Sequence, residues 1–243
     1  MSSPDWQSDD GTVQLYCADC MDVLPDLDGV DAVVTDPPYG EVNRETGGLR
    51  SLHKGVSDVV TFSVSELART FSRVSNGSVY IWCGIEQVSE YRRILVLEGL
   101  STRLCGWEKS NPSPMNGERM WLSSFECCIF ARRAGAWFGR HCASPIWRGP
   151  TQREQVHPTQ KPLWLMRELV SASVPPDGCC LDAFMGSGTT GVACVQLGRR
   201  FIGIEKEPRY FEIAVRRIKE AFSDQGLFNG EMSECQMDLA LKE

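Results

Sequence analysis

Residues 181–191 read Leu-Asp-Ala-Phe-Met-Gly-Ser-Gly-Thr-Thr-Gly, and this stretch decides the fold. The apolar run over 179–184 predicts a buried strand, and the pattern that starts at Thr189 predicts a helix. Between them, Gly186 and Gly188 let the backbone approach a ligand closely, and the helix start favours an anionic group. Glu205 ends the next predicted strand, where an acid can bind ribose hydroxyls. This order of elements predicts a site for a cofactor that carries an adenosine ribose.

A second motif, Asp36-Pro37-Pro38-Tyr39, follows the β-rich run 30–35. Neither proline can donate to a sheet, so the strand must end there. A carboxylate at the carboxyl end of such a strand lies where ligands bind in open α/β sheets. Asp36, with a backbone carbonyl held by the stiff Pro37-Pro38 segment, could accept both hydrogens of an exocyclic base amine. Tyr39 offers a ring on which a flipped base could stack.

Strands and helices are predicted to alternate along the chain, which indicates a mostly parallel sheet with helices on both faces. Residues 41–60 are predicted to form a loop, and residues 133–156, rich in Gly, Trp, Pro and Arg, show no clean period. We expect one domain over 1–243, with 133–156 as a small insert and 223–243 as an acidic tail without fixed structure. The predicted strands are 12–17, 30–35, 78–83, 102–109, 125–131, 179–184 and 200–204, and the predicted helices are 21–27, 63–73, 86–98, 163–173, 189–197 and 208–222.

The composition is that of a globular protein, with 42% apolar and 23% charged residues. No apolar run is long enough to span a bilayer, and no signal peptide is apparent, so we expect a cytoplasmic protein without a membrane partner. Eleven cysteines are present, but Cys17-x-x-Cys20 has no second pair of the kind that a zinc site usually needs. We therefore expect free thiols and no metal.

The net charge of −7 is unevenly distributed. Residues 1–36 carry nine acids and no Lys or Arg, whereas residues 131–167 carry seven Lys or Arg against one acid, Glu154. The basic segment is either a solvated loop or a local footprint for phosphates. On the second interpretation, the residues that contact DNA are Arg132, Arg133, Arg140, Arg148 and Arg153.

Together these motifs resemble the amino-methyltransferases of DNA, in the permuted class whose catalytic tetrapeptide precedes the glycine loop. The resemblance extends from Val13 to about Arg217 and includes the segment His157-Pro158-Thr159-Gln160-Lys161-Pro162. It implies a Rossmann-like fold, S-adenosylmethionine as cofactor and double-stranded DNA as partner. It also implies methyl transfer to a flipped base, with 133–156 reading the target sequence.

The resemblance further implies a role for individual residues. Asp36, Pro37, Pro38 and Tyr39 would handle the target base. Asp19, with Cys20 beside it, would contact the cofactor adenine, and Glu205 would hold its ribose. The remaining cofactor contacts would come from Asp182, Phe184, Gly186, Gly188, Thr159 and Gln160.

Several alternatives remain open at this point. Methylation of N4 of cytosine uses the same geometry, although family members of that kind usually have Ser in place of Asp36, so Asp36 favours N6 of adenine. The chain could also be a non-catalytic DNA-binding subunit with the same fold. A dinucleotide oxidoreductase would explain the glycine loop but not Asp36 to Tyr39. The sequence also leaves open a homodimer, the recognition sequence and a restriction partner.

Overall fold

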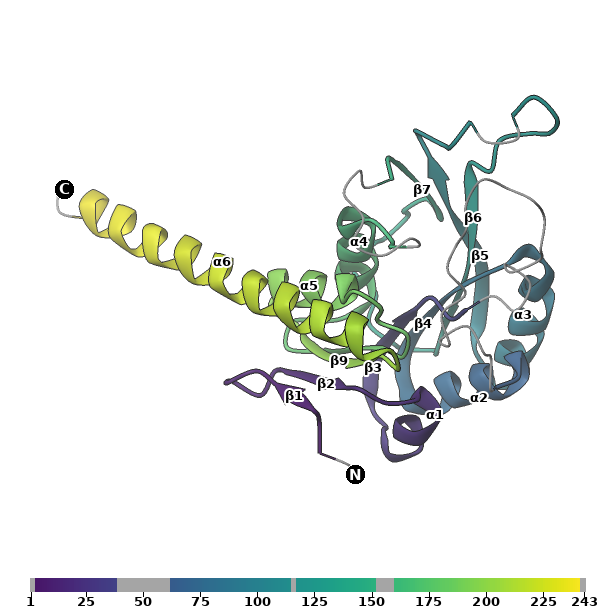
Figure 1. Cartoon of the computed structure of the whole chain (residues 1–243), viewed down its shortest axis with the longest axis horizontal. Helices are drawn as coiled ribbons and strands as arrows, with labels where there is room; N and C mark the ends of the chain where they lie inside the picture. Colours follow the sequence, from purple (N-terminus) through teal and green to yellow (C-terminus); the bar gives the residue numbers. More distant parts are fainter. Residues whose placement is uncertain (1–2, 39–61, 115–116, 152–159, 241–243) are drawn as a thin grey trace.

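The computed structural model describes residues 3–38, 62–114, 117–151 and 160–240, with side chains described up to residue 224. The described residues form one nine-stranded sheet in the order β1-β2-β9-β8-β3-β4-β6-β5-β7 (Figure 1). The strands are β1 (Trp6–Gln7), β2 (Val13–Tyr16), β3 (Val30–Thr35), β4 (Ser75–Cys83), β5 (Ser101–Lys109), β6 (Phe125–Arg132), β7 (Ile146–Gly149), β8 (Cys179–Asp182) and β9 (Arg200–Ile204).

Seven of these strands run in one direction. The pairs β2–β9, β9–β8, β8–β3, β3–β4 and β5–β7 are parallel, whereas β6 runs antiparallel to both of its neighbours and β1 is antiparallel to β2. The expectation of a mostly parallel sheet is therefore confirmed. The carboxyl ends of β2, β9, β8, β3, β4, β5 and β7 meet at one edge of the sheet, together with the first residue of β6.

Helices cover both faces of the sheet, as expected (Figure 1). Alternate residues of β3 face opposite ways: Ala32 and Val34 belong to the core beneath one group of helices, and Val33 belongs to the other core. The first group is α4 (Leu163–Ser173), α5 (Thr189–Gln196) and α6 (Pro208–Ala240). The second is α1 (Cys20–Val23), η1 (Leu24–Asp26), α2 (Val64–Val74) and α3 (Val88–Leu97), the last preceded by η3 (Ile85–Gln87).

The structure differs from the sequence prediction at three places. The segment 133–156 contributes strand β7, which pairs with β5 and extends the sheet, so this segment is not wholly separate from the core. The short strand β1 was not predicted. Helix α6 continues to Ala240 and projects from the sheet, where we expected an acidic tail over 223–243 without fixed structure (Figure 1).

The part of the chain that the structure describes contains no helix long and apolar enough to cross a membrane.

Candidate active site

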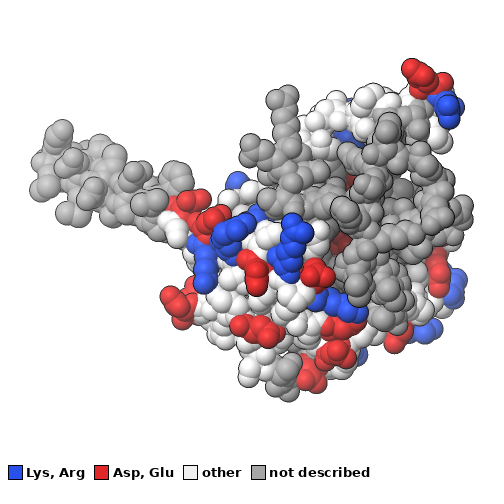
Figure 2. All heavy atoms as spheres, viewed as in Figure 1, with Lys and Arg blue, Asp and Glu red and all other residues white. Residues whose placement is uncertain are grey.

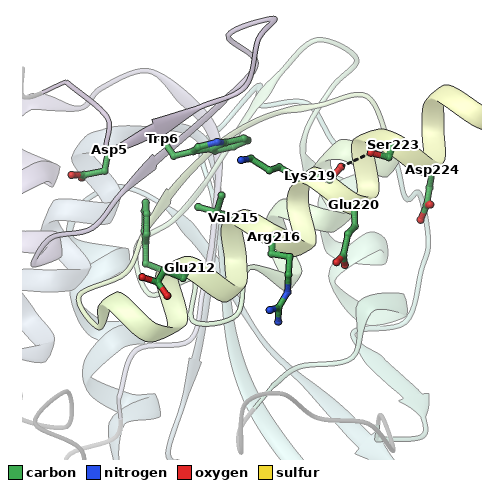
Figure 3. Close-up of a pocket in the computed structure, with 10 residues that line it drawn as sticks. Asp5, Trp6, Glu212, Val215, Arg216, Lys219, Glu220, Ser223 and Asp224 are labelled. Atoms are coloured by element: carbon green, nitrogen blue, oxygen red, sulfur yellow. Dashed lines mark hydrogen bonds between the residues drawn. The ribbon is translucent and has the colours of Figure 1, made fainter.

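The topology places a candidate ligand site between the carboxyl ends of β8 and β3. A pocket between Trp6 and α6 (Figure 3) is lined by none of the candidate site residues. Strands β8 and β3 are neighbours, with Ala32 opposite Cys180 and Val33 opposite Leu181. The chain leaves β8 to form α5 on one face of the sheet and leaves β3 towards α2 on the other face. The two connections therefore diverge and open a crevice at this point, which is where open α/β sheets bind their ligands.

Both sequence motifs reach this crevice. Asp36 follows β3 directly, and Asp182 is the last residue of β8. The hydroxyl of Thr35, next to Asp36, donates to Asp182 Oδ1 at 2.9 Å, so the two strand ends are joined by a buried hydrogen bond. Pro37 is buried and Pro38 is half-buried, whereas Tyr39 lies outside the described residues. The structure thus brings the candidate catalytic carboxylate next to the candidate cofactor loop.

A chain of ion pairs extends from Asp36 to the far strands of the sheet. Lys161 Nζ lies 2.5 Å from Asp36 Oδ2 and 3.2 Å from Glu126 Oε2, and Lys109 Nζ lies 2.6 Å from Glu126 Oε1. The Lys161 ammonium also lies 5.1 Å from the centre of the buried Trp82 ring, a cation–π distance. Four alternating charges therefore connect the ends of β3, β5 and β6 with the residues before α4.

The electrostatics of this chain keep its buried members charged. Burial would lower the pKa of Lys161, but Asp36 and Glu126 hold the pKa above its ordinary value. Burial would likewise raise the pKa of Glu126, but Lys161 and Lys109 bring it below its ordinary value. Neither Lys161 nor Glu126 was predicted as a site residue. Lys161 could have been found from the sequence, because it lies in the segment 157–162 that resembles a family motif.

Asp182 makes contacts different from those that the resemblance implied. It is buried, Thr35 and Thr190 donate their hydroxyls to its two oxygens at 2.9 and 2.6 Å, and the Phe184 amide donates to Oδ1 at 3.2 Å. Burial raises the pKa of Asp182 to about 6 in spite of these hydrogen bonds. Its described contacts hold the start of the glycine loop to β3 and α5, which is a structural task.

The glycine loop is fixed from three sides. The Gly186 amide donates to Glu205 Oε2 at 2.9 Å, and the Ser187 hydroxyl donates to Gln160 Oε1 at 3.2 Å. Arg217 of α6 donates to the Ser187 carbonyl and to the Ser187 and Thr189 hydroxyls. Arg217 was not predicted, because no local pattern indicates that α6 reaches this loop.

The two candidate glycines have different tasks. Both have a positive φ, +51° at Gly186 and +77° at Gly188, which disfavours other residues there. A Cβ at Gly188 would lie 2.8 Å from the Cβ of Ala214, so this glycine lets α6 pack against the loop. A Cβ at Gly186 would meet no heavy atom within 4 Å. Space for a ligand therefore lies beside Gly186.

Glu205 and Asp19 lie at the ends of neighbouring strands. Glu205, directly after β9, also accepts the Glu207 amide at 2.8 Å, and burial raises its pKa. Asp19 caps α1 by accepting the Met21 amide at 3.0 Å and pairs with Lys206 at 2.9 Å. Because Lys206 follows Glu205, the two candidate cofactor acids are held near each other. Cys20 is buried behind Asp19, where burial raises its thiol pKa to about 12.

Of the other predicted cofactor residues, Phe184 packs against Phe62 with ring centres 5.3 Å apart. Thr159 lies outside the described residues. Within the described part of the chain, no group of three or more His, Cys, Asp or Glu side chains could hold a metal ion.

The structure separates most of the candidate DNA-binding arginines from the crevice. Arg132 ends β6, which runs away from the crevice edge, and Arg133 follows it directly. Arg132 is six residues, or about 20 Å, from Glu126. Arg133 donates to the carbonyls of Ser72 and Ser75, and Arg132 to that of Ala136. These two side chains therefore hold the opposite edge of the sheet together.

Arg140 and Arg148 differ in their positions. Arg140 pairs with Glu168 in the middle of α4 at 2.9 Å and donates to the Ser171 hydroxyl further along the same helix, which runs away from the crevice. Arg148 lies in β7 opposite Glu108, at the crevice edge, where it pairs with that residue at 2.8 Å and remains 76% exposed. Arg153 lies outside the described residues. Charged side chains of both signs are intermixed on the face that Figure 2 shows.

The comparisons with known proteins agree with this geometry. Residues 107–216 match the family described as DNA methylase. The chain is 30% identical over 224 residues to the type II methyltransferase M2.DpnII of Streptococcus pneumoniae, an alignment that covers 79% of this chain and 83% of that protein. It is 29% identical over 249 residues to M2.MboI of Moraxella bovis, which covers 89% of this chain and 91% of that protein.

A solved structure is also similar. The M1.HpyAVI structure, determined as a complex with SAM, superposes with a TM-score of 0.68 at 30% identity, over 85% of this chain and 99% of that chain. Its similarity confirms the expected Rossmann-like methyltransferase fold. The chain belongs to the DNA methylase family and is a DNA amino-methyltransferase.

Proposed function

We propose that this enzyme transfers a methyl group from S-adenosylmethionine to N6 of a flipped adenine in double-stranded DNA. The observation that carries the proposal is the position of Asp36. Its carboxylate lies at the carboxyl end of β3, beside the glycine loop that follows β8, with the diproline segment next to it. An acceptor in this crevice can meet the amine of a base that has left the helix.

The cofactor assignment rests on the solved relative, whose structure contains SAM, and on the fit of this site. The space beside Gly186 accommodates close approach of a ligand to the loop. Glu205 and Asp19 would offer carboxylates to the ribose hydroxyls and the adenine amine, and Phe184, Gly186 and Gln160 would line the methionyl end. When bound, S-adenosylmethionine supplies an activated methyl group on a sulfonium.

The residues of this chain then have to orient the base and stabilise charge. Asp36 accepts a hydrogen of the exocyclic amine, and the Pro37 carbonyl accepts the other. As the nitrogen takes the methyl group, the bond from the methyl carbon to sulfur would break and leave a neutral thioether. The nitrogen becomes positive, the Asp36 carboxylate stabilises that charge, and the methylated amine then releases one proton to solvent. The ion pair with Lys161 fixes the direction of the carboxylate beforehand, and positioning of the two reactants supplies much of the rate.

Contact with DNA is assigned to the crevice edge of the sheet. We propose that the segment 133–156, within one domain over 1–243, contributes to target recognition through Arg148 and β7, which reach this edge. We assign Arg132, Arg133 and Arg140 a structural role, because Arg132 and Arg133 donate to backbone carbonyls and Arg140 pairs with Glu168 on the surface of α4.

The test is to express the enzyme in a bacterial host without amino-methylated DNA and to analyse the digested nucleosides by mass spectrometry. We expect N6-methyladenine in the DNA of expressing cells and none with Asp36→Ala. N4-methylcytosine in place of N6-methyladenine would overturn the adenine assignment and identify a cytosine-N4 methyltransferase. Unmodified DNA, with cofactor binding intact in the purified protein, would indicate a non-catalytic subunit. Single-molecule sequencing of the same DNA gives the recognition sequence.

A further inference from the structure

Three consecutive large apolar residues are exposed in the loop between β5 and β6. Met120 is 66% exposed, Trp121 is 97% exposed and Leu122 is 41% exposed. A tryptophan offers a large apolar area, and soluble proteins usually bury most of it. Adjacent exposed apolar side chains of this size mark a surface that meets a partner.

The position of the loop indicates which partner. β5 ends and β6 begins at the crevice edge, where the Lys109 amide donates to the Ser124 carbonyl at 2.7 Å and closes the loop. Lys109 pairs with Glu126, and that residue pairs in turn with Lys161, the partner of Asp36. The base of the loop is therefore joined to the candidate catalytic carboxylate by ion pairs. Figure 1 shows the loop projecting beyond the ends of β5 and β6.

The loop has a defined local shape around these side chains. The Gly117 amide donates to the Pro114 carbonyl at 3.0 Å, and the Ser124 amide donates to the Leu122 carbonyl at 2.8 Å. A Cβ at Gly117 would lie 2.9 Å from Leu122 Cδ2, so Leu122 folds back against the loop. This contact supports the tip and leaves the Trp121 ring in solvent.

We propose that Met120-Trp121-Leu122 is a wedge that enters duplex DNA at the target and fills the space that the flipped nucleotide leaves. The inference rests on the proposed function. Removing a base from the stack exposes the faces of its neighbours, and an apolar side chain inserted there replaces part of the lost stacking. The Trp121 ring provides a flat aromatic face of the size of a base.

The experiment compares two duplexes that contain the sequence methylated by the wild-type enzyme. In one the target base is paired, and in the other it lies opposite an abasic site, where flipping breaks no base pair and costs less free energy. We expect Trp121→Ala to slow methylation of the paired duplex by about ten- to a hundredfold. On the abasic duplex the same variant should approach the wild-type rate, and Trp121→Phe should retain most of the activity on both.

Leu97→Ala is the matched control. Leu97 is 69% exposed but ends α3, at the edge of the sheet opposite the crevice, so its loss should change neither rate. Wild-type activity of Trp121→Ala on the paired duplex, or an equal loss on both duplexes, would overturn the wedge. A change of oligomeric state in Trp121→Ala, measured by sedimentation, would also overturn it and assign the loop to a second copy of the chain. If the wild-type enzyme methylates no DNA sequence, so that neither duplex can be designed, the proposed function itself has failed.

Discussion

Lys161 Nζ and Asp36 Oδ2 lie 2.5 Å apart, although 125 positions separate the two residues in the chain. The contact joins the tetrapeptide after β3 to the segment that leads into α4. Lys161 is almost fully buried, and Glu126 provides a second carboxylate for it. The candidate catalytic acid is therefore part of a buried charged unit, and substitutions within that unit have separable effects on catalysis and folding.

Asp36→Asn should reduce methyl transfer by at least about a hundredfold, because it removes the charge that stabilises the positive nitrogen while keeping the side-chain shape. Affinity for S-adenosylmethionine should stay within about twofold of wild type, since the candidate cofactor ligands are other residues. Single-turnover rates and calorimetry measure the two quantities. Near-wild-type turnover would refute the assigned role of Asp36.

Lys161→Met should destabilise the protein by roughly 3–5 kcal/mol at neutral pH, because two carboxylates would lose their shared partner. The pH dependence of this loss follows from Glu126, because Lys161 holds the pKa of that carboxyl below its ordinary value. That stabilisation is present above the ordinary carboxyl pKa and is lost as pH falls, so the difference between variant and wild type should shrink in acid. Denaturation at several pH values measures the free energy of unfolding of both proteins, and Lys161→Arg is the charge-preserving control.

Glu205→Ala should weaken binding of S-adenosylmethionine by about ten- to a hundredfold, the effect of losing one hydrogen bond to a charged group. The variant also removes the acceptor of the Gly186 amide, so Glu205→Gln, which keeps an acceptor oxygen, should lose less. Calorimetry with both variants distinguishes these contributions. Equal affinity in all three proteins would show that Glu205 is not a cofactor ligand.

Asp182 should make the fold less stable as pH rises from about 4 to 6. Its pKa is raised by burial from 3.8 to about 6, so the folded state binds more protons in this interval than the unfolded state does. A shift of this size corresponds to roughly 3 kcal/mol. Asp182→Asn should remove this component of the pH dependence. Identical stability profiles for variant and wild type would contradict the raised pKa.

Arg148→Ala should weaken DNA binding and reduce the log–log salt slope by about one unit, the loss of one phosphate contact. Arg140→Ala should leave both unchanged, because its side chain is held against the second half of α4 by Glu168 and Ser171. The two variants remove the same charge, so net charge is matched. Equal effects of the two substitutions would show that the phosphate-binding face extends beyond the crevice edge.

The sequence predicted those parts of the fold whose signals are local. The strand over 179–184, its glycine loop and the helix after it are specified by neighbouring residues, and the structure contains them as β8, the loop and α5. The four residues of β7 were not predicted, because a short edge strand has too few positions to show a period.

The candidate site was predictable only where local sequence patterns position its residues. Asp36 and Glu205 could be placed because each follows a recognisable strand. The contacts of Lys161 and Arg217 depend on long-range packing that no spacing reveals. The count of charges in the basic segment also did not show that β6 runs antiparallel, which places Arg132 and Arg133 at the edge opposite Arg148. The DNA contacts of these arginines stay predictions.

The reversed direction of β6 has a further consequence. The chain leaves the crevice edge at Lys109 and returns to it at Phe125, and the pairing of β5 with β6 closes the intervening segment. Doubling the length of a loop closed in this way costs only about 0.6 kcal/mol of entropy. The segment 110–124 can therefore change in length at little entropic cost while the charged unit of Asp36, Lys161, Glu126 and Lys109 beneath it keeps its geometry.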